Sequence, residues 1–281
     1  MSFNKHLIIL GTARSGTSWL SETISRQYRY RMLFEPEHET RTPKGHLLCD
    51  QWLTNIEQSP KAYSYLKKVF LNRVDCDWIA QNSNRHFKRH LWPVIPKKYI
   101  IKFVRANLLG HYLSDNFNVP VVHLLRSPYD VIYSQKQVKF PWLYDLDIFA
   151  SQTRLVNLLK ETFNLNLLEY KKLSDLEILC LRWCIENVVP LERIGNKSNK
   201  IYVLKYEELR SDINVFFDLC NHFNLTPVAN IREVYKTPSS KTHPSKNTLD
   251  IEGKNKNWNI KELQQINHIL DIFKTQLYKR L

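Results

Sequence analysis

The sequence predicts an α/β protein in which helices flank a central parallel sheet. Short apolar runs that suit buried strands alternate with stretches of helical periodicity along the 281 residues. No internal repeat or low-complexity tract divides the chain, and α/β folds of this size commonly form one domain. We therefore expect a single domain over residues 1–281, with helical insertions around 40–98 and 140–196 and a last helix over 260–281.

The first predicted strand, Leu7–Leu10, runs into a phosphate-sized loop, Gly11–Gly16, and a helix starts at Thr17. A strand that turns through glycine into a helix leaves several backbone N–H groups unpaired, in front of the positive end of the helix dipole. Side-chain donors surround the same loop: Arg14, Ser15, Thr17 and Ser18. The stretch therefore predicts a binding site for phosphate or a close analogue.

This loop differs at one position from the loop of nucleotide triphosphatases. Those proteins read G-x-x-x-x-G-K-[ST], and the lysine reaches the β- and γ-phosphates. Here the order is G-T-A-R-S-G-T-S, so Thr17 replaces the lysine and the cation is Arg14, inside the loop. A nucleotide kinase-like phosphotransferase is therefore kept only as an alternative.

A second strand-to-helix turn carries another arginine. Val121–Leu125 is apolar enough for a buried parallel strand, and Arg126 follows it directly. Ser127 is placed to cap the helix that Pro128 opens. Ser134 comes eight residues after Arg126, with the helix start between them. This spacing predicts that the two side chains meet one anion.

A candidate general base lies in the sequence between these two turns. Met32 to Phe34 predicts a short strand that ends at Glu35, and a carboxylate at the carboxyl end of a strand lies where ligands bind in open parallel sheets. Glu37, His38 and Glu39 in the same loop are alternatives for this role. An ion pair with a nearby arginine is the structural interpretation of Glu35.

Together these motifs resemble the sulfotransferases that use 3′-phosphoadenosine 5′-phosphosulfate (PAPS). The first loop resembles their 5′-phosphosulfate loop, in which Lys or Arg precedes S-G-T-[ST]-W-L, and the second turn resembles their 3′-phosphate motif, h-h-h-h-R-[DNS]-P-x-[DA]-h-x-x-S. The F-E-P triplet at Glu35 is similar to that of carbohydrate sulfotransferases. The resemblance implies a P-loop-NTPase-like three-layer fold, PAPS as cosubstrate, and transfer of its sulfuryl group to an acceptor hydroxyl.

The resemblance also implies roles for particular residues. Glu35 is the catalytic base, and Arg14 neutralises the charge that grows on the leaving oxygen. The implied cofactor-binding residues are Arg14, Ser15, Gly16, Thr17, Ser18, Trp19, Arg126, Ser134, Lys254 and Trp258. The last two belong to a segment, within 236–261, that matches a loop closing over the 3′-phosphate, although the R-K-G loop of the cytosolic estrogen and phenol enzymes is absent.

Further segments resemble elements around this site. They supply Lys102 and Arg105, which face the acceptor in the family, and Trp183 and Asn187, from a helix beside the cofactor. The predicted strand that carries Lys102 and Arg105 spans residues 99–107. Another predicted strand spans residues 200–209. Tyr206 and Glu207, at the end of the second strand, are expected to tie it to the next helix.

The net charge of +14 favours anionic partners. Because Lys and Arg are spread along the chain rather than concentrated in one stripe, nucleic acid is not predicted as a partner. A non-catalytic polyanion-binding module is the second alternative. The F-E-P triplet and a basic aromatic cluster at 85–92 favour an oligosaccharide or glycolipid acceptor. Oligomeric state and peripheral membrane contact stay open.

Cellular location and metal content follow from what the sequence lacks. It has no run of about 18 apolar residues to span a membrane and no room for a signal peptide before the first strand, so we expect a cytoplasmic protein. The five cysteines have no C-x-x-C spacing and fit reduced thiols. No H-x-x-x-H cluster occurs either, and we expect no metal.

Overall fold

A computed structural model describes residues 2–27, 30–81, 98–194, 201–240 and 258–281. Within these ranges one five-stranded sheet has the order β2-β3-β1-β4-β5, and every neighbouring pair is parallel. The strands are β1 (Leu7–Leu10), β2 (Tyr30–Phe34), β3 (Lys98–Lys102), β4 (Val121–Leu125) and β5 (Ile201–Lys205). Because all are parallel, their carboxyl ends share one edge of the sheet.

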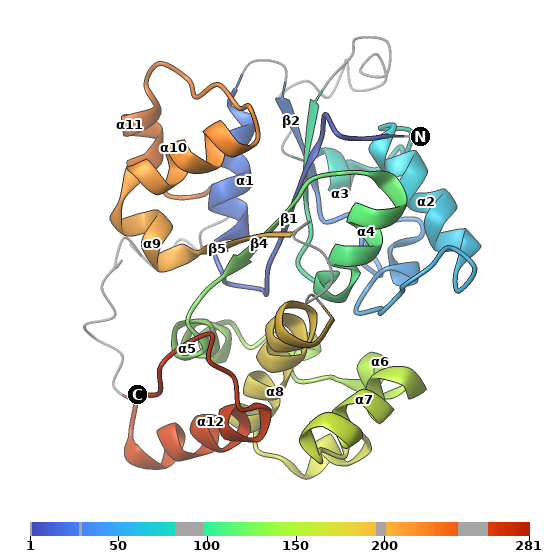
Figure 1. The fold of residues 1–281 in the computed structure, drawn as a ribbon, viewed down its shortest axis with the longest axis vertical. Helices are drawn as coiled ribbons and strands as arrows, with labels where there is room; N and C mark the ends of the chain where they lie inside the picture. The colour runs from blue at the N-terminus through green and yellow to red at the C-terminus, as the bar shows by residue number, and fades with distance from the viewer. Residues whose placement is uncertain (1, 28–29, 82–97, 195–200, 241–257) are drawn as a thin grey trace.

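Helices cover both faces of the sheet (Figure 1). One face carries α1 (Thr17–Ser25), α9 (Tyr206–Ser211), α10 (Ile213–His222) and α11 (Ile231–Lys236), and the other carries α2 (Pro60–Phe70), α3 (Asp77–Ala80) and α4 (Gly110–Phe117). In β1, Leu7 and Ile9 pack into the first group, whereas Ile8 and Leu10 pack into the second. Alternation along a strand that is buried on both faces explains the continuous apolar run.

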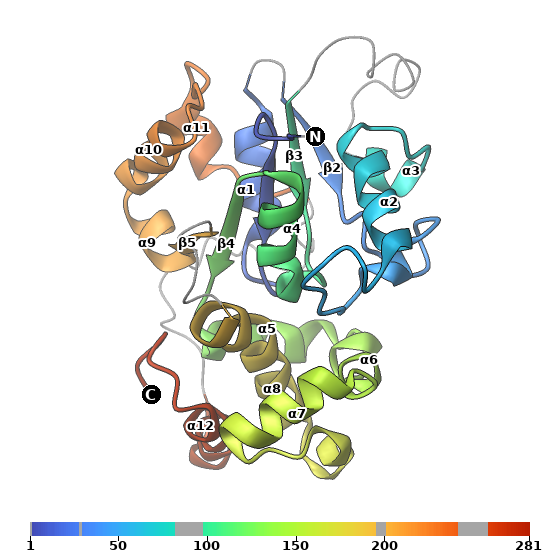
Figure 2. The same cartoon turned by 45° about the vertical axis from the view of Figure 1, so that its right-hand side comes forward.

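A third group of helices lies beyond the carboxyl edge of the sheet (Figure 2). It contains α5 (Pro128–Val138), α6 (Asp147–Ala150), α7 (Thr153–Phe163), α8 (Asp175–Val188) and α12 (Ile260–Phe273). The shorter helical turns are Gly45–Leu47, Asn107–Leu109, Pro141–Leu143 and Leu167–Lys172, with a π-helical turn at Val189–Ile194.

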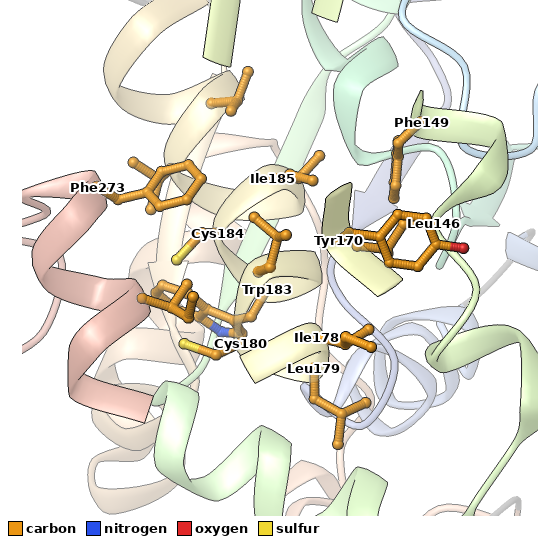
Figure 3. Close-up of a cluster of buried hydrophobic side chains, with 14 of the residues drawn as sticks. Leu146, Phe149, Tyr170, Ile178, Leu179, Cys180, Trp183, Cys184, Ile185 and Phe273 are labelled. Atoms are coloured by element: carbon orange, nitrogen blue, oxygen red, sulfur yellow. The ribbon is translucent and has the colours of Figure 1, made fainter. Parts of the chain in front are cut away.

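Helix α8 is the centre of this third group. Trp183, Cys184 and Ile185 pack with Phe273 of α12 and with Phe149 in one buried cluster (Figure 3). The helix begins with a capping box between Ser174 and Glu177, which satisfies its first amide groups. A helix buried on all sides carries its polar residues into the interior, where each needs a partner.

The structure confirms the predicted P-loop-NTPase-like three-layer fold, and β1 and β4 have the predicted bounds.

Three predicted boundaries are wrong. The strand predicted at 99–107 ends at Lys102, and the amides of Val104 and Arg105 bond to the side chain of Glu37 instead of a strand. The strand predicted at 200–209 ends at Lys205, because α9 begins with two acids that suit a helix N-terminus. The helix predicted at 260–281 ends at Phe273, before Lys274 in the left-handed conformation.

Two predicted contacts lie outside the described residues: the basic aromatic cluster at 85–92 and Lys254. In the described part of the chain, no helix has both the length and the apolar character needed to cross a membrane.

Candidate active site

The loop between β1 and α1 ends in a backbone conformation that residues other than glycine rarely adopt. Gly16 has φ 97° and precedes the first residue of α1. A Cβ at Gly16 would lie 2.3 Å from the ring of Tyr206, and one at Gly11 would lie 2.7 Å from the carbonyl oxygen of Leu124. The two glycines of the motif are therefore required by backbone conformation and by close approach.

Three side chains from α5, α8 and the end of β4 hold three consecutive residues of this loop. Asn187 Nδ2 donates to Thr12 Oγ1 over 2.8 Å. Gln135 Nε2 donates to the carbonyl of Ala13 over 3.0 Å, and Arg126 Nη1 donates to the carbonyl of Arg14 over 3.0 Å. The loop is thus fixed in place by the elements that carry the second motif and the helix beside it.

The two predicted anion motifs meet at Arg14. Its Nε donates to Ser134 Oγ over 2.9 Å, and Arg126 bonds to its carbonyl. Burial, and then the positive charge of Arg126, lower the pKa of Arg14. Strands β1 and β4 are neighbours, and the chain has moved from one side of β1 to the other between them, which is where open parallel sheets bind ligands. The result is a concentration of positive charge at a helix N-terminus.

The corner after β5 belongs to this site as well. The Arg126 guanidinium lies 4.5 Å from the ring centre of Tyr206, the same ring that packs against Gly16. Glu207 accepts hydrogen bonds from the Ser127 amide over 2.9 Å and from the Tyr278 hydroxyl over 2.6 Å. These residues therefore support both anion motifs, which goes beyond the predicted link between strand and helix.

Sequence reasoning missed two features of this corner. Ser127 is the N-cap residue of α5, but its side chain makes no capping hydrogen bond. Its backbone amide donates a hydrogen bond to the Glu207 carboxylate. Tyr278 lies in the segment predicted as helix, and no local pattern marks its contact with Glu207. Burial, and then the charge of Glu207, raise the pKa of Tyr278.

Glu35 follows β2 and forms an ion pair with Lys102, the last residue of β3. The Lys102 side chain is 3% exposed and that of Glu35 is 18% exposed. The Lys102 ammonium also lies 4.2 Å from the ring centre of Phe34. The structure thus brings the predicted base and a predicted acceptor-facing residue into direct contact at the carboxyl edge of the sheet.

The three alternative bases have other contacts, and Glu39 pairs with Arg105 Nη1 over 2.8 Å. Glu37 is buried, and one of its oxygens accepts from the amides of Val104 at 2.6 Å and Arg105 at 3.0 Å. Burial, and then the charge of Glu35, raise the pKa of Glu37. The ring of His38 packs edge-on against Trp78, with centroids 4.8 Å apart, and burial lowers its pKa.

The remaining predicted cofactor residues fall in two places. Ser15, Thr17 and Trp19 are buried and Ser18 is half-buried at the start of α1. Trp19 Nε1 donates to the carbonyl of Thr237 over 3.2 Å. Trp258 packs against Tyr133 of α5, with ring centroids 5.6 Å apart, one residue before Ser134. Trp183 Nε1 donates to the carbonyl of Arg126 over 3.1 Å.

No three His, Cys, Asp or Glu side chains are grouped to hold a metal ion in the part of the chain that the structure describes.

The fold and this site define an α/β protein with an arginine in a P-loop-like turn. The model of the sulfotransferase domain matches residues 4–258, and the chain therefore belongs to the sulfotransferase family, whose reaction is sulfuryl transfer. No curated protein matches the chain at a significant level.

Solved sulfotransferase structures are similar to this chain over most of its length. The sulfotransferase domain from the curacin biosynthetic pathway is 14% identical, with a TM-score of 0.49 and coverage of 99% of this chain and 100% of the other. The domain from the Synechococcus PCC 7002 olefin synthase is 15% identical, with a TM-score of 0.49 and coverage of 97% and 95%. Mouse sulfotransferase SULT7A1, complexed with PAP, is 11% identical, with a TM-score of 0.48 and coverage of 98% and 87%.

Proposed function

We propose that this protein transfers the sulfuryl group of PAPS to a hydroxyl group of a carbohydrate acceptor. The observation that carries the proposal is the meeting of Arg14, Ser134 and Arg126 at the loop before α1. PAPS has two anionic ends, a 5′-phosphosulfate and a 3′-phosphate. A site with two arginines from two adjacent strand ends has the matching charge.

Donors around the loop also fit a phosphate group. Ser15 Oγ and Arg126 Nε are buried and have no hydrogen-bond partner among the described residues. Buried donors are normally satisfied, so these two atoms suit the oxygens of a bound anion. The N-terminus of α1 adds its amide groups and its dipole. Thr17 in place of the P-loop lysine agrees with a cosubstrate that is not a triphosphate.

In the proposed reaction the acceptor oxygen attacks the sulfur in line with the phosphate oxygen that departs. The new O–S bond forms as the S–O bond to phosphate breaks, and Glu35 takes the proton of the acceptor hydroxyl. Arg14 stabilises the negative charge that grows on the departing phosphate oxygen. Catalysis then rests on positioning and charge, because the reaction needs no covalent intermediate with the protein.

The contacts of the loop after β2 favour Glu35 over Glu37 as the base. Glu37 is 1% exposed and is occupied by two backbone amides, whereas the side chain of Glu35 reaches solvent. A base must come within hydrogen-bond distance of the substrate hydroxyl, which favours the more accessible carboxylate.

Aromatic side chains beside Glu35 support a carbohydrate acceptor. Phe34 and His38 both pack edge-on against Trp78, and the Arg41 guanidinium lies 5.6 Å from the centre of a Trp78 ring. Aromatic rings can stack on sugar rings, and arginine can pair with an acidic group of a glycan. The net charge of +14 favours an acidic glycan further.

Transfer of radiolabelled sulfate from PAPS to a panel of acceptors tests the proposal. The panel contains neutral and acidic oligosaccharides, glycolipids, a tyrosine peptide and small alcohols, and the Arg14→Ala variant serves as the inactive control. We expect label on an oligosaccharide or glycolipid. Label only on the peptide or the alcohols would refute the carbohydrate assignment, and equal labelling by Arg14→Ala would refute the site.

A further inference from the structure

The peptide group that follows Arg126 lies between β4 and α5, and side chains from two other helices hold both of its polar atoms. Its oxygen, the Arg126 carbonyl, accepts a hydrogen bond from Trp183 Nε1 of α8 over 3.1 Å. Its N–H, the Ser127 amide, donates to Glu207 Oε1 of α9 over 2.9 Å. The orientation of this peptide group, and with it the direction of the Arg126 side chain, therefore depends on Trp183 and Glu207.

Glu207 takes the place that a residue of α5 itself would have in a capping box. In that motif the third residue of the helix accepts a hydrogen bond from the N-cap amide. In α5 the N-cap is Ser127 and the third residue is Asp130, whose carboxylate lies 3.8 Å from Arg126 Nη2. Because Glu207 accepts from the Ser127 amide, the Asp130 carboxylate can pair with the Arg126 guanidinium instead.

The hydroxyl of Tyr278 holds the other oxygen of Glu207. It donates to Glu207 Oε2 over 2.6 Å, while Oε1 accepts from the Ser127 amide. Hydrogen bonds to a charged group are short and strong. With one such bond on each oxygen, the carboxylate is held in a single orientation toward the Ser127 amide.

The segment that carries Tyr278 is attached to α5 and α12 by other contacts as well (Figure 1). The Leu281 amide donates to the Tyr129 hydroxyl of α5 over 3.0 Å. Arg280 Nε donates to Asp271 of α12 over 2.9 Å, and Arg280 Nη1 donates to the Tyr278 carbonyl over 3.3 Å. Removal of the Tyr278 hydroxyl alone should therefore leave the segment in place.

We propose that Tyr278 is a positioning residue, which holds Arg126 in place for the 3′-phosphate of the cosubstrate. It acts through Glu207 and the Ser127 amide, and so through the backbone of Arg126. Rotation of the peptide group after Arg126 would move the guanidinium away from the position that receives the phosphate. This inference rests on the proposed use of PAPS.

Two nucleotides that differ only in the 3′-phosphate test this role. They are adenosine 3′,5′-bisphosphate (PAP), titrated by calorimetry, and adenosine 5′-monophosphate (AMP), measured by competition against PAP. Tyr278→Phe keeps the ring and removes the hydroxyl. We expect it to weaken PAP binding about threefold to tenfold and AMP binding less than about twofold. Equal weakening of both nucleotides, or weakening of neither, would overturn the proposal.

The matched control is Tyr170→Phe, which removes another tyrosine hydroxyl that is bonded to a carboxylate, that of Asp147, at 2.7 Å. Tyr170 belongs to the helical turn Leu167–Lys172 and contacts neither Glu207 nor Arg126 through this hydroxyl. Its PAP and AMP affinities are expected to equal those of the unaltered protein. A selective loss of PAP affinity in this control as large as that in Tyr278→Phe would overturn the proposal.

Variants of Glu207 test the link between the hydroxyl and the backbone. Glu207→Ala removes the acceptor of the Ser127 amide and should weaken PAP binding selectively, whereas Glu207→Gln keeps an acceptor oxygen there and should retain most of the affinity. If Tyr278 acts through Glu207, Tyr278→Phe in the Glu207→Ala background adds no further loss. Independent, additive losses would overturn the proposal. If Tyr278→Phe fails to fold, equal PAP affinities of the two Glu207 variants would overturn it by themselves.

Failure of this inference is distinguishable from failure of the proposed function. If the unaltered protein does not bind PAP, the PAPS assignment fails and the inference fails with it. If the unaltered protein prefers PAP to AMP and Tyr278→Phe keeps that preference in full, the PAPS assignment stands and Tyr278 is a structural residue only.

Discussion

Arg14 Nε donates a hydrogen bond to Ser134 Oγ over 2.9 Å, although 120 residues separate them in the sequence. The sequence motifs predict Arg14 at the 5′ end of PAPS and Ser134 at its 3′-phosphate. Parallel pairing of β1 with β4 brings the ends of these two strands, and with them the two residues, close together. The bond gives the Arg14 side chain a defined orientation in this loop.

Arg14→Ala is expected to reduce sulfuryl transfer by roughly 100- to 1000-fold or more, because it removes the charge that stabilises the departing phosphate oxygen. Steady-state turnover with radiolabelled PAPS measures the loss. Lys61→Ala, an exposed cation on α2, is the control and should retain full activity. Turnover near the unaltered level in Arg14→Ala would show that the loop is not the phosphosulfate site.

Glu35→Gln is expected to lower the turnover number on the order of 100- to 10,000-fold while PAP affinity is unchanged. Glu37→Gln is the informative comparison, since the amide oxygen can still accept from the amides of Val104 and Arg105. Its turnover should stay within a few-fold of the unaltered protein. A larger loss in Glu37→Gln than in Glu35→Gln would move the base to Glu37.

Arg126→Ala is expected to weaken PAPS binding roughly 10- to 100-fold, as loss of a charged hydrogen-bond donor would. Adenosine 5′-phosphosulfate lacks the 3′-phosphate, so its binding should weaken far less. Competition titrations with both nucleotides measure the difference. Equal weakening of the two would show that Arg126 does not bind the 3′-phosphate.

His123 should make the protein less stable in mild acid. It is fully buried, its Nε2 lies 2.9 Å from Asn187 Oδ1, and burial lowers its pKa from 6.5 to about 4. The unfolded chain takes up a proton near pH 6.5 and the folded chain does not, so stability is full above pH 6.5 and falls as pH drops toward 4. The contribution is on the order of 3 kcal/mol by pH 4.

Urea unfolding at several pH values between 7 and 4 checks the histidine prediction against the His123→Gln variant. The variant is expected to be less stable at pH 7 but to lose less stability on acidification. If both proteins lose the same free energy of unfolding between pH 7 and 4, the acid sensitivity comes from other groups.

Local patterns were sufficient for the centre of the fold. Leu7–Leu10 and Val121–Leu125 are continuous apolar runs, and glycine or Arg-Ser-Pro ends each of them, so both strand bounds follow from neighbouring residues. The spacing of Arg126 and Ser134 likewise depends on one turn and one helix. The structure confirms that these local signals placed the two arginines at one edge of the sheet.

The rest of the site depends on contacts between distant segments. Arg182 and Glu186 are four residues apart in a helix, a spacing typical of a solvated surface pair, and only tertiary packing shows that both are buried. Lys102 marks no strand end in the sequence, since apolar residues continue after it. Tyr278 contacts Glu207 from a tail that the periodicity predicts as helix.

Calorimetric titration with PAP, with and without magnesium, tests the central claim most directly. We expect one tight PAP site per chain, with an affinity that magnesium does not change and that Arg126→Ala reduces. Binding of Mg-ATP in preference to PAP would contradict the use of PAPS and support the kinase alternative. Binding of neither nucleotide would also contradict the use of PAPS and would support a non-catalytic polyanion-binding module.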